Sequence, residues 1–215
     1  MLLDVLLGIA TIIIGYLLGS IPFAYIVAKL NKGVDIREVD TGNVGAAATM
    51  RGIGVWQGIV VVIADIAKGA VAILIAQALG VHLFWVLGAG FAAFLGHNFP
   101  VYIGFKGGHG AATTIGIFLV LAPLETFCAL IIIGIVLLIS FRKVLHRFVL
   151  ALSVGAPFLP IFIWTFGTWI FKGSPERILT LTIYAIVMVL FLVCRNLPSV
   201  IAPLQAPRKK WKEKA

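Results

Sequence analysis

Long apolar stretches dominate the chain, and short polar segments interrupt them at intervals. Several stretches approach or exceed the ~18 apolar residues that cross a bilayer as a helix. Gly, Pro and charged residues between them favour turns and loops. We therefore predict an all-α, polytopic integral membrane protein. Its seven expected transmembrane helices lie at approximately 2–28, 54–79, 82–99, 110–124, 125–141, 148–171 and 178–195.

The region 110–141 allows two interpretations. As one straight helix it would be about 48 Å long, well over the ~30 Å hydrocarbon core of a bilayer. As two helices that meet at the Pro-Leu-Glu sequence of residues 123–125, each half is shorter than the usual ~20 residues. Short halves can also be re-entrant, so full crossing is one of two alternatives.

The distribution of Lys and Arg favours two helices in this region. With seven spans, fourteen Lys and Arg residues lie on one face, two (Lys172 and Arg177) lie on the other, and Lys68 lies inside a span. With six spans the same residues divide seven against nine. Because cytoplasmic loops concentrate Lys and Arg, we expect the N-terminus outside and the C-terminus in the cytoplasm.

Composition agrees with a membrane protein that has no separate soluble domain. The chain is 61% hydrophobic and 12% charged, with a mean hydropathy of +1.13. We expect one domain over 1–207 and a basic cytoplasmic tail over 208–215. The net charge of +9 suits membrane lipids or phosphorylated substrates better than nucleic acid, since there is no basic face on a soluble fold. No clustered His and carboxylate residues suggest a metal site.

Three polar islands fall on the predicted cytoplasmic side: residues 35–51, 96–114 and 194–207. In the second island, Gly107, Gly108 and Gly110 stand beside Lys106 and His109, directly before an apolar helix. Glycine lets amides approach an anion closely, and a helix N-terminus adds partial positive charge. This island therefore predicts a binding site for a phosphate or a carboxylate group. Glycines elsewhere, such as Gly15 and Gly19, have the spacing of helix-packing residues.

Two of these islands carry long motifs. The first contains TGNVGAAATMR, and the second contains GHNFPVYIGFKGGHGAATTIG. Together with LLGSIPFAYIVAK and DIAKGA they resemble the bacterial acyl-phosphate-dependent glycerol-3-phosphate acyltransferases over nearly the whole chain. The chain departs from that pattern where Thr41 replaces Ser, Ala47 and Ala48 replace Thr and Asn, and His109 replaces Lys. The third motif, RNLPSVIAPLQAP, lacks the family's Gly-x-Glu.

The resemblance implies an enzyme of the inner (plasma) membrane whose active site faces the cytoplasm. It would move a fatty acyl group from acyl phosphate to glycerol 3-phosphate in phospholipid synthesis, without a cofactor. The enzyme that makes acyl phosphate is then a candidate partner. The resemblance implies catalytic roles for Arg51, Lys106, His109 and Asn196. It implies substrate binding by Thr41, Gly42, Asn43, Gly45, His97, Gly107, Gly108, Gly110 and Arg195.

Two other functions stay open at this point. A paralogue could keep the fold and bind a phosphorylated lipid or metabolite without turnover, as the altered third motif and His109 suggest. A small transporter would need broken helices at the midplane and an internal repeat, and the sequence has no such repeat. Asp65 and Lys68, three residues apart within one span, are expected to form an ion pair that supports the site.

Overall fold

The computed structural model describes residues 2–39, 44–139, 151–152, 154–170 and 172–205, with the main chain alone over 197–205. The predicted tail, 208–215, lies outside these residues. Regular structure in the described part is helical. Its elements are α1 (Leu2–Ser20), α2 (Phe23–Lys32), η1 (Ile36–Glu38), α3 (Ala46–Gly52), α4 (Val55–Ala78), α5 (Leu83–Asn98), η2 (Val101–Ile103), α6 (Ala111–Leu121), α7 (Pro123–Ile139), α9 (Phe158–Thr165), η3 (Phe166–Ile170) and α10 (Pro175–Gln205).

Apolar helices account for every predicted span. Within the described part of the chain, four helical segments are long and apolar enough to cross a membrane: Leu2–Lys32, Val55–Ala78, Leu83–Ile103 and Pro175–Asn196. Three shorter apolar helices lie in the remaining predicted spans. The all-α, multi-pass fold class is thus confirmed. The number of crossings stays a prediction, since the 11 residues of α6 extend only about 17 Å.

The described part of the region 110–141, residues 110–139, forms two helices, as the charge distribution favoured. Ala122 separates α6 from α7 with a non-helical backbone, at φ −150° and ψ 70°. Pro123 then opens α7, where its missing N–H is no loss because the first residues of a helix have no helical acceptor. The interpretation as one long helix is therefore wrong.

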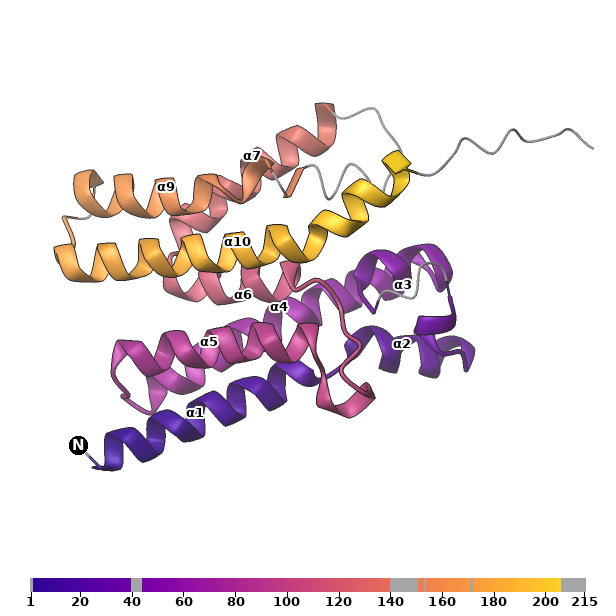
Figure 1. The fold of residues 1–215 in the computed structure, drawn as a ribbon, viewed down its shortest axis with the longest axis horizontal. Helices are drawn as coiled ribbons and strands as arrows, with labels where there is room; N and C mark the ends of the chain where they lie inside the picture. Colours follow the sequence, from indigo (N-terminus) through magenta and orange to yellow (C-terminus); the bar gives the residue numbers. More distant parts are fainter. Residues whose placement is uncertain (1, 40–43, 140–150, 153, 171, 206–215) are drawn as a thin grey trace, which may run out of the picture.

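The first predicted span is not one continuous helix. α1 ends at Ser20 and α2 begins at Phe23, so that Ile21 and Pro22 lie outside both helices. Pro22 has no N–H to donate, and its ring disfavours the helical conformation for Ile21. The helix therefore breaks near its end, and Figure 1 shows α2 continuing toward α3.

The third polar island is helical over its described residues, 194–205, where a loop was expected between or after the spans. α10 continues to Gln205, past the end of the span predicted at 195. Arg195 and Asn196 are consequently helical residues. The rotation of α10 about its own axis determines which way their side chains point. Pro198 lies within this helix, so a proline alone did not end it here.

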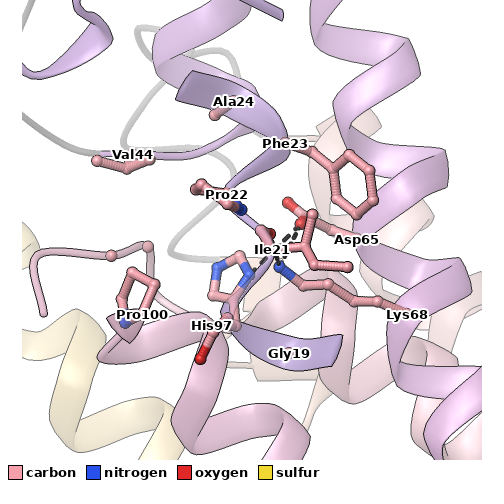
Figure 2. Close-up of a pocket in the computed structure, with 13 residues that line it drawn as sticks. Gly19, Ile21, Pro22, Phe23, Ala24, Val44, Asp65, Lys68, His97 and Pro100 are labelled. Atoms are coloured by element: carbon pink, nitrogen blue, oxygen red, sulfur yellow. Dashed lines mark hydrogen bonds and ion pairs between the residues drawn. The ribbon is translucent and has the colours of Figure 1, made fainter. Parts of the chain in front are cut away.

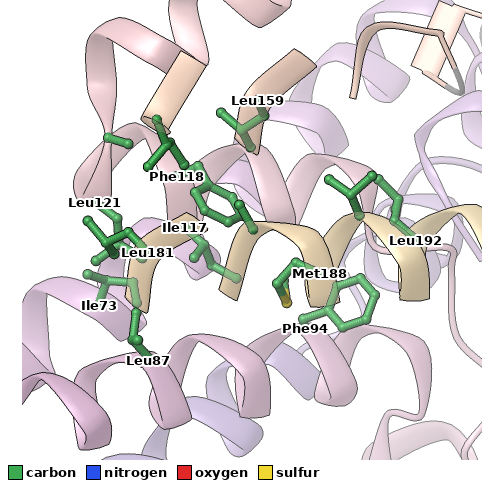
Figure 3. Close-up of a cluster of buried hydrophobic side chains, with 14 of the residues drawn as sticks. Ile73, Leu87, Phe94, Ile117, Phe118, Leu121, Leu159, Leu181, Met188 and Leu192 are labelled. Atoms are coloured by element: carbon green, nitrogen blue, oxygen red, sulfur yellow. The ribbon is translucent and has the colours of Figure 1, made fainter. Parts of the chain in front are cut away.

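The main core lies between the long helices and packs against one side of α10. Buried side chains from α4, α5, α6, α9 and α10 meet there (Figure 3), with Phe94, Phe118, Met188 and Leu192 among them. Phe94 contacts Phe191 edge-on, with ring centroids 5.5 Å apart. This packing fixes α10 against α5, the helix that leads into the second island.

Glycines let α1 and α5 pack at close range. A Cβ on Gly15 would lie 2.4 Å from the carbonyl oxygen of Ala89, and one on Gly19 would lie 2.0 Å from that of Ala93. Gly15 meets Ala89 and Gly19 meets Ala93, so residue numbers rise in the same direction along both helices. The two helices therefore run parallel. The packing role expected for Gly15 and Gly19 is confirmed.

The three polar islands lie at one end of the molecule. In Figure 1, α2, α3, the segment between α5 and α6, and the C-terminal end of α10 are all at the right, whereas the chain start and the α9–α10 connection are at the left. A second, smaller core seats the first island on α4. Its buried residues are Ala24, Ala28, Ile36, Val44, Ala48, Ile53 and Val61.

Candidate functional site

A buried ion pair lies where the α1–α2 break meets α4 and α5 (Figure 2). Lys68 Nζ is 2.8 Å from Asp65 Oδ1, and both side chains are buried, with 4% and 5% of their surface exposed. The same ammonium donates to the carbonyl oxygen of Ile21 at 3.0 Å. His97 Nδ1 lies 3.5 Å from Asp65 Oδ1. The expected Asp65–Lys68 ion pair is therefore confirmed.

The glycine-rich loop of the second island folds back onto the end of α5. Gly107 N–H donates to the Asn98 carbonyl at 3.2 Å, and Gly108 N–H donates to the His97 carbonyl at 3.1 Å. A Cβ on Gly107 would lie 2.1 Å from the His97 carbonyl oxygen, and one on Gly108 would lie 2.3 Å from His97 Nε2. These two glycines permit close approach to α5, and their amides are already used within the loop.

Gly110 begins the helix that follows this loop. It has φ +86° and is the N-cap of α6, a left-handed conformation that glycine adopts without strain. The expected transition from the glycine-rich turn into a helix is confirmed. The first N–H groups of α6 have no helical acceptor, so they face the end of the loop as potential anion donors.

The first island contributes a short helix. Gly45 is the N-cap of α3, and Arg51 lies in the last turn of α3 with an exposed side chain. Thr41, Gly42 and Asn43 are outside the described residues. Val44, the first described residue after them, lines the same cavity as His97, Gly107 and Gly108.

Arg37 joins the first island to the second. Its Nη1 donates to the Ile103 carbonyl at 3.1 Å, while its Nε donates to Asp35 Oδ1 at 3.0 Å. Hydrogen bonding to Arg37 lowers the pKa of Asp35. The guanidinium also lies 5.5 Å from the centre of the Tyr25 ring. This contact was not expected from sequence, because nothing local to Arg37 indicates Ile103 as its partner.

The third island approaches the second through Arg195. Its guanidinium lies 5.3 Å from the centre of the Phe99 ring, immediately after α5. Burial and the positive charge of Arg195 lower the pKa of His109 to about 4, so His109 is neutral at pH 7. Asn196 is buried and donates Nδ2–H to the Leu192 carbonyl at 2.7 Å. The structure thus brings Arg195 and His109 together, whereas this bond of Asn196 is internal to its helix.

The cavity beneath the motif loops is too small for a substrate. Its volume is about 10 Å³, the size of a single water molecule. Residues from the α1–α2 break, α4, α5 and the glycine-rich loop line it. Lys106 in the glycine-rich loop and Arg51 on α3 are both exposed. Neither cation lines this cavity, and both lie at the molecular surface.

Several buried polar atoms near the cavity and the start of α6 were not expected from sequence. Among the described residues, Ser20 Oγ, His97 Nδ1, Asn98 Oδ1, Thr113 Oγ1 and Thr114 Oγ1 are buried without a hydrogen-bond partner. Polar atoms buried among apolar helices are costly and mark functional candidates. Their sequence signal is weak, because small hydroxyl residues are common in membrane helices. The described residues contain no group of three His, Cys, Asp or Glu able to hold a metal ion.

Comparison with known sequences identifies the family. A sequence profile described as glycerol-3-phosphate acyltransferase matches residues 9–202. The chain belongs to the glycerol-3-phosphate acyltransferase family. The resemblance drawn from its motifs is confirmed.

Two relatives show how far this family likeness extends. A glycerol-3-phosphate acyltransferase of Shouchella clausii is 47% identical over 134 residues, which cover 61% of this chain and 63% of the relative. The match therefore spans less than two thirds of that relative's length. One from Halalkalibacterium halodurans is 37% identical over 192 residues, which cover 81% of this chain and 93% of the relative.

The family fold also agrees with a solved structure. PlsY, an integral membrane glycerol 3-phosphate acyltransferase, matches in its glycerol 3-phosphate form with a TM-score of 0.78. The two are 31% identical, and the match covers 92% of each chain. The lysophosphatidic acid form of PlsY matches with a TM-score of 0.75.

Proposed function

We propose that this protein transfers a fatty acyl group from acyl phosphate to glycerol 3-phosphate, giving lysophosphatidic acid and phosphate in phospholipid synthesis. The observation that carries the proposal is the likeness to PlsY in its glycerol 3-phosphate form over 92% of each chain. The family match over residues 9–202 supports it. The binding paralogue and the transporter have no comparable observation in their favour.

Acyl phosphate is already activated, so the protein's contribution is position and charge. The glycerol hydroxyl oxygen attacks the acyl carbon, and the carbon–oxygen bond to phosphate breaks. The leaving phosphate takes up the hydroxyl proton, so the transfer needs no base from the protein. Charge that develops on the acyl phosphate oxygens is then stabilised by fixed cations and N–H groups.

We assign the two phosphate-binding cations to Arg51 and Lys106. Both are exposed at the end of the molecule where the islands meet. In this assignment Arg51 holds one phosphate together with Thr41, Gly42, Asn43 and Gly45. Lys106 holds the other, with the first N–H groups of α6 in place of the occupied amides of Gly107 and Gly108.

His109 serves as a neutral hydrogen-bonding group in this scheme. A pKa of about 4 removes its charge at pH 7, so it does not act as the second cation of the loop. Arg195, which lies beside it, carries the fixed positive charge there instead. Asn196 is the next residue on α10, and its amide is buried beside this group.

We further propose that the active site faces the cytoplasm from the inner membrane. In the described part of the chain, α2, η1, α3, the glycine-rich loop and α10 bring Lys29, Lys32, Arg37, Arg51, Lys106 and Arg195 to the island end. Cytoplasmic faces concentrate such residues. Acyl phosphate and glycerol 3-phosphate would meet there at the membrane surface, and the enzyme that supplies acyl phosphate is the expected partner.

The test is acyl transfer by the purified protein in detergent. Palmitoyl phosphate and glycerol 3-phosphate are supplied, and lysophosphatidic acid and released phosphate are measured. We expect turnover that falls about 100-fold or more in Arg51→Ala and in Lys106→Ala, since each removes a charge contact to a phosphate. Lys172→Ala, which removes an exposed cation at the opposite end, is the matched control and should retain activity.

Folded wild-type protein that binds glycerol 3-phosphate without turnover would contradict the proposal and favour the binding paralogue. Full activity in Arg51→Ala would remove Arg51 from the site while leaving the reaction intact.

A further inference from the structure

The buried ion pair of α4 is connected at both ends to segments that carry the site. Asp65 and Lys68 lie on one face of α4, where both are almost fully buried. Placing two charges among apolar helices is unfavourable unless their partners are well arranged. The contacts of these two residues indicate why they are retained.

Lys68 holds the α1–α2 break. The helix breaks at Ile21 and Pro22, so the Ile21 carbonyl lies outside the helical hydrogen-bond pattern. It accepts from the Phe23 N–H at 3.2 Å and from Lys68 Nζ at 3.0 Å. The ammonium also lies 5.7 Å from the centre of the Phe23 ring, at the start of α2. The direction in which α2 leaves the break is therefore set partly from α4, and α2 leads into the first island.

Asp65 also lies close to His97, at ion-pair distance and without a hydrogen bond. Its Oδ1 lies 3.5 Å from His97 Nδ1 and 2.8 Å from Lys68 Nζ. The Nε2 edge of the imidazole abuts the glycine-rich loop, because a Cβ on Gly108 would lie 2.3 Å from His97 Nε2. The His97 carbonyl also accepts the Gly108 N–H. The position of the imidazole thus bears directly on the loop that carries Lys106.

We propose that Asp65, Lys68 and His97 form a buried positioning relay that fixes the two motif islands relative to each other. Lys68 secures the α1–α2 break, Asp65 links Lys68 to His97, and His97 supports Gly108. None of the three touches the reacting atoms in this proposal. It rests on the proposed acyl transfer, and it adds that catalysis depends on residues beneath the loops as well as on those that bind phosphate.

Two independent readouts test the relay. The first is acyl transfer, measured as kcat and KM. The second is the distance between spin labels on Leu30→Cys in α2 and Tyr102→Cys in η2, after Cys128 and Cys194 are replaced by Ser. Leu30 and Tyr102 are 80% and 57% exposed, so labels at these positions should not disturb the core.

The decisive variant is the double substitution Asp65→Asn/Lys68→Met. It removes both charges at once, so it avoids the uncompensated buried charge that a single substitution would leave. Arg37 and its bond to Ile103 remain in place. Glu125→Gln in α7 is the matched control, because it removes a buried carboxylate, 7% exposed, outside the relay.

We expect the folded double variant to show a broader label-to-label distance distribution and a kcat about 100-fold below wild type, the scale of a misplacement of about 1 Å. The Glu125→Gln control should match wild type in both readouts. An unchanged distance distribution together with unchanged kcat in the folded double variant would overturn the relay. If wild type lacks turnover, the proposed function fails, and the distance measurement still decides the relay by itself.

Discussion

Gly107 and Gly108 bring the glycine-rich loop so close to α5 that a methyl group on either would collide with atoms of His97. Their N–H groups donate to the carbonyls of Asn98 and His97, so they shape the loop and do not point at a ligand. Lys106, the adjacent residue, remains exposed. At the residue scale, the loop thus separates two tasks: glycines provide close packing, and the lysine provides charge.

His109 gives a prediction about pH. Its pKa is about 4 in the folded protein and about 6.5 when unfolded, so between these values the unfolded chain binds more protons. Stability from this residue is therefore complete above pH 6.5 and is lost as the pH falls toward 4. We expect His109→Gln to lose less thermal stability than wild type over pH 6.5 to 4, measured by melting in detergent.

The difference between the two melting curves isolates His109 from the other titrating groups. Parallel losses in wild type and His109→Gln over this range would contradict a depressed pKa at this position.

At the element scale, the site depends on how α1, α4 and α5 are joined. Gly15 and Gly19 let the main chain of α1 lie directly against the main chain of α5. α5 then leads into the second island. Lys68 on α4 then holds the break after α1. The three helices therefore determine where both islands begin, before any loop residue contacts a substrate.

Close packing of α1 on α5 predicts that an added methyl group destabilises the protein at Gly19 in α1 and not at Gly134 in α7. Gly19→Ala would place a Cβ 2.0 Å from the main-chain oxygen of Ala93, and we expect a loss of about 1–3 kcal/mol as the helices separate. Gly134→Ala in α7 meets nothing within 4 Å and should be neutral or more stable by about 0.5–1 kcal/mol, since alanine favours helix. Unfolding in detergent measures both, and equal effects would refute main-chain packing at Gly19.

At the scale of the whole molecule, charge and motifs gather at the same end. In the described part of the chain, the end with α2, α3, the glycine-rich loop and the C-terminal end of α10 carries six Lys and Arg residues. The opposite end carries Lys172 before α10 and Arg177 in its first turn. An orientation set by positive charge would hence place the candidate site in the cytoplasm. The cations that would bind phosphate also favour that orientation.

Labelling of single cysteines checks this orientation. In a variant lacking Cys128 and Cys194, we expect a membrane-impermeant maleimide to label Trp169→Cys on intact cells, since Trp169 is 83% exposed in η3. Tyr102→Cys, 57% exposed in η2, should react only after the membrane is opened. Labelling of Tyr102→Cys on intact cells would contradict a cytoplasmic site.

The sequence by itself determined the all-α membrane class, the approximate helix positions and the family. Those features depend on local hydrophobicity and on residue types in contiguous motifs such as GHNFPVYIGFKGGHG. Only the tertiary structure decided the continuation of α10 past Arg195 and the internal use of the Gly107 and Gly108 amides. It also joined Lys68 to Ile21 and Arg37 to Ile103. These features depend on which atoms from distant segments meet, and a local pattern carries no record of that.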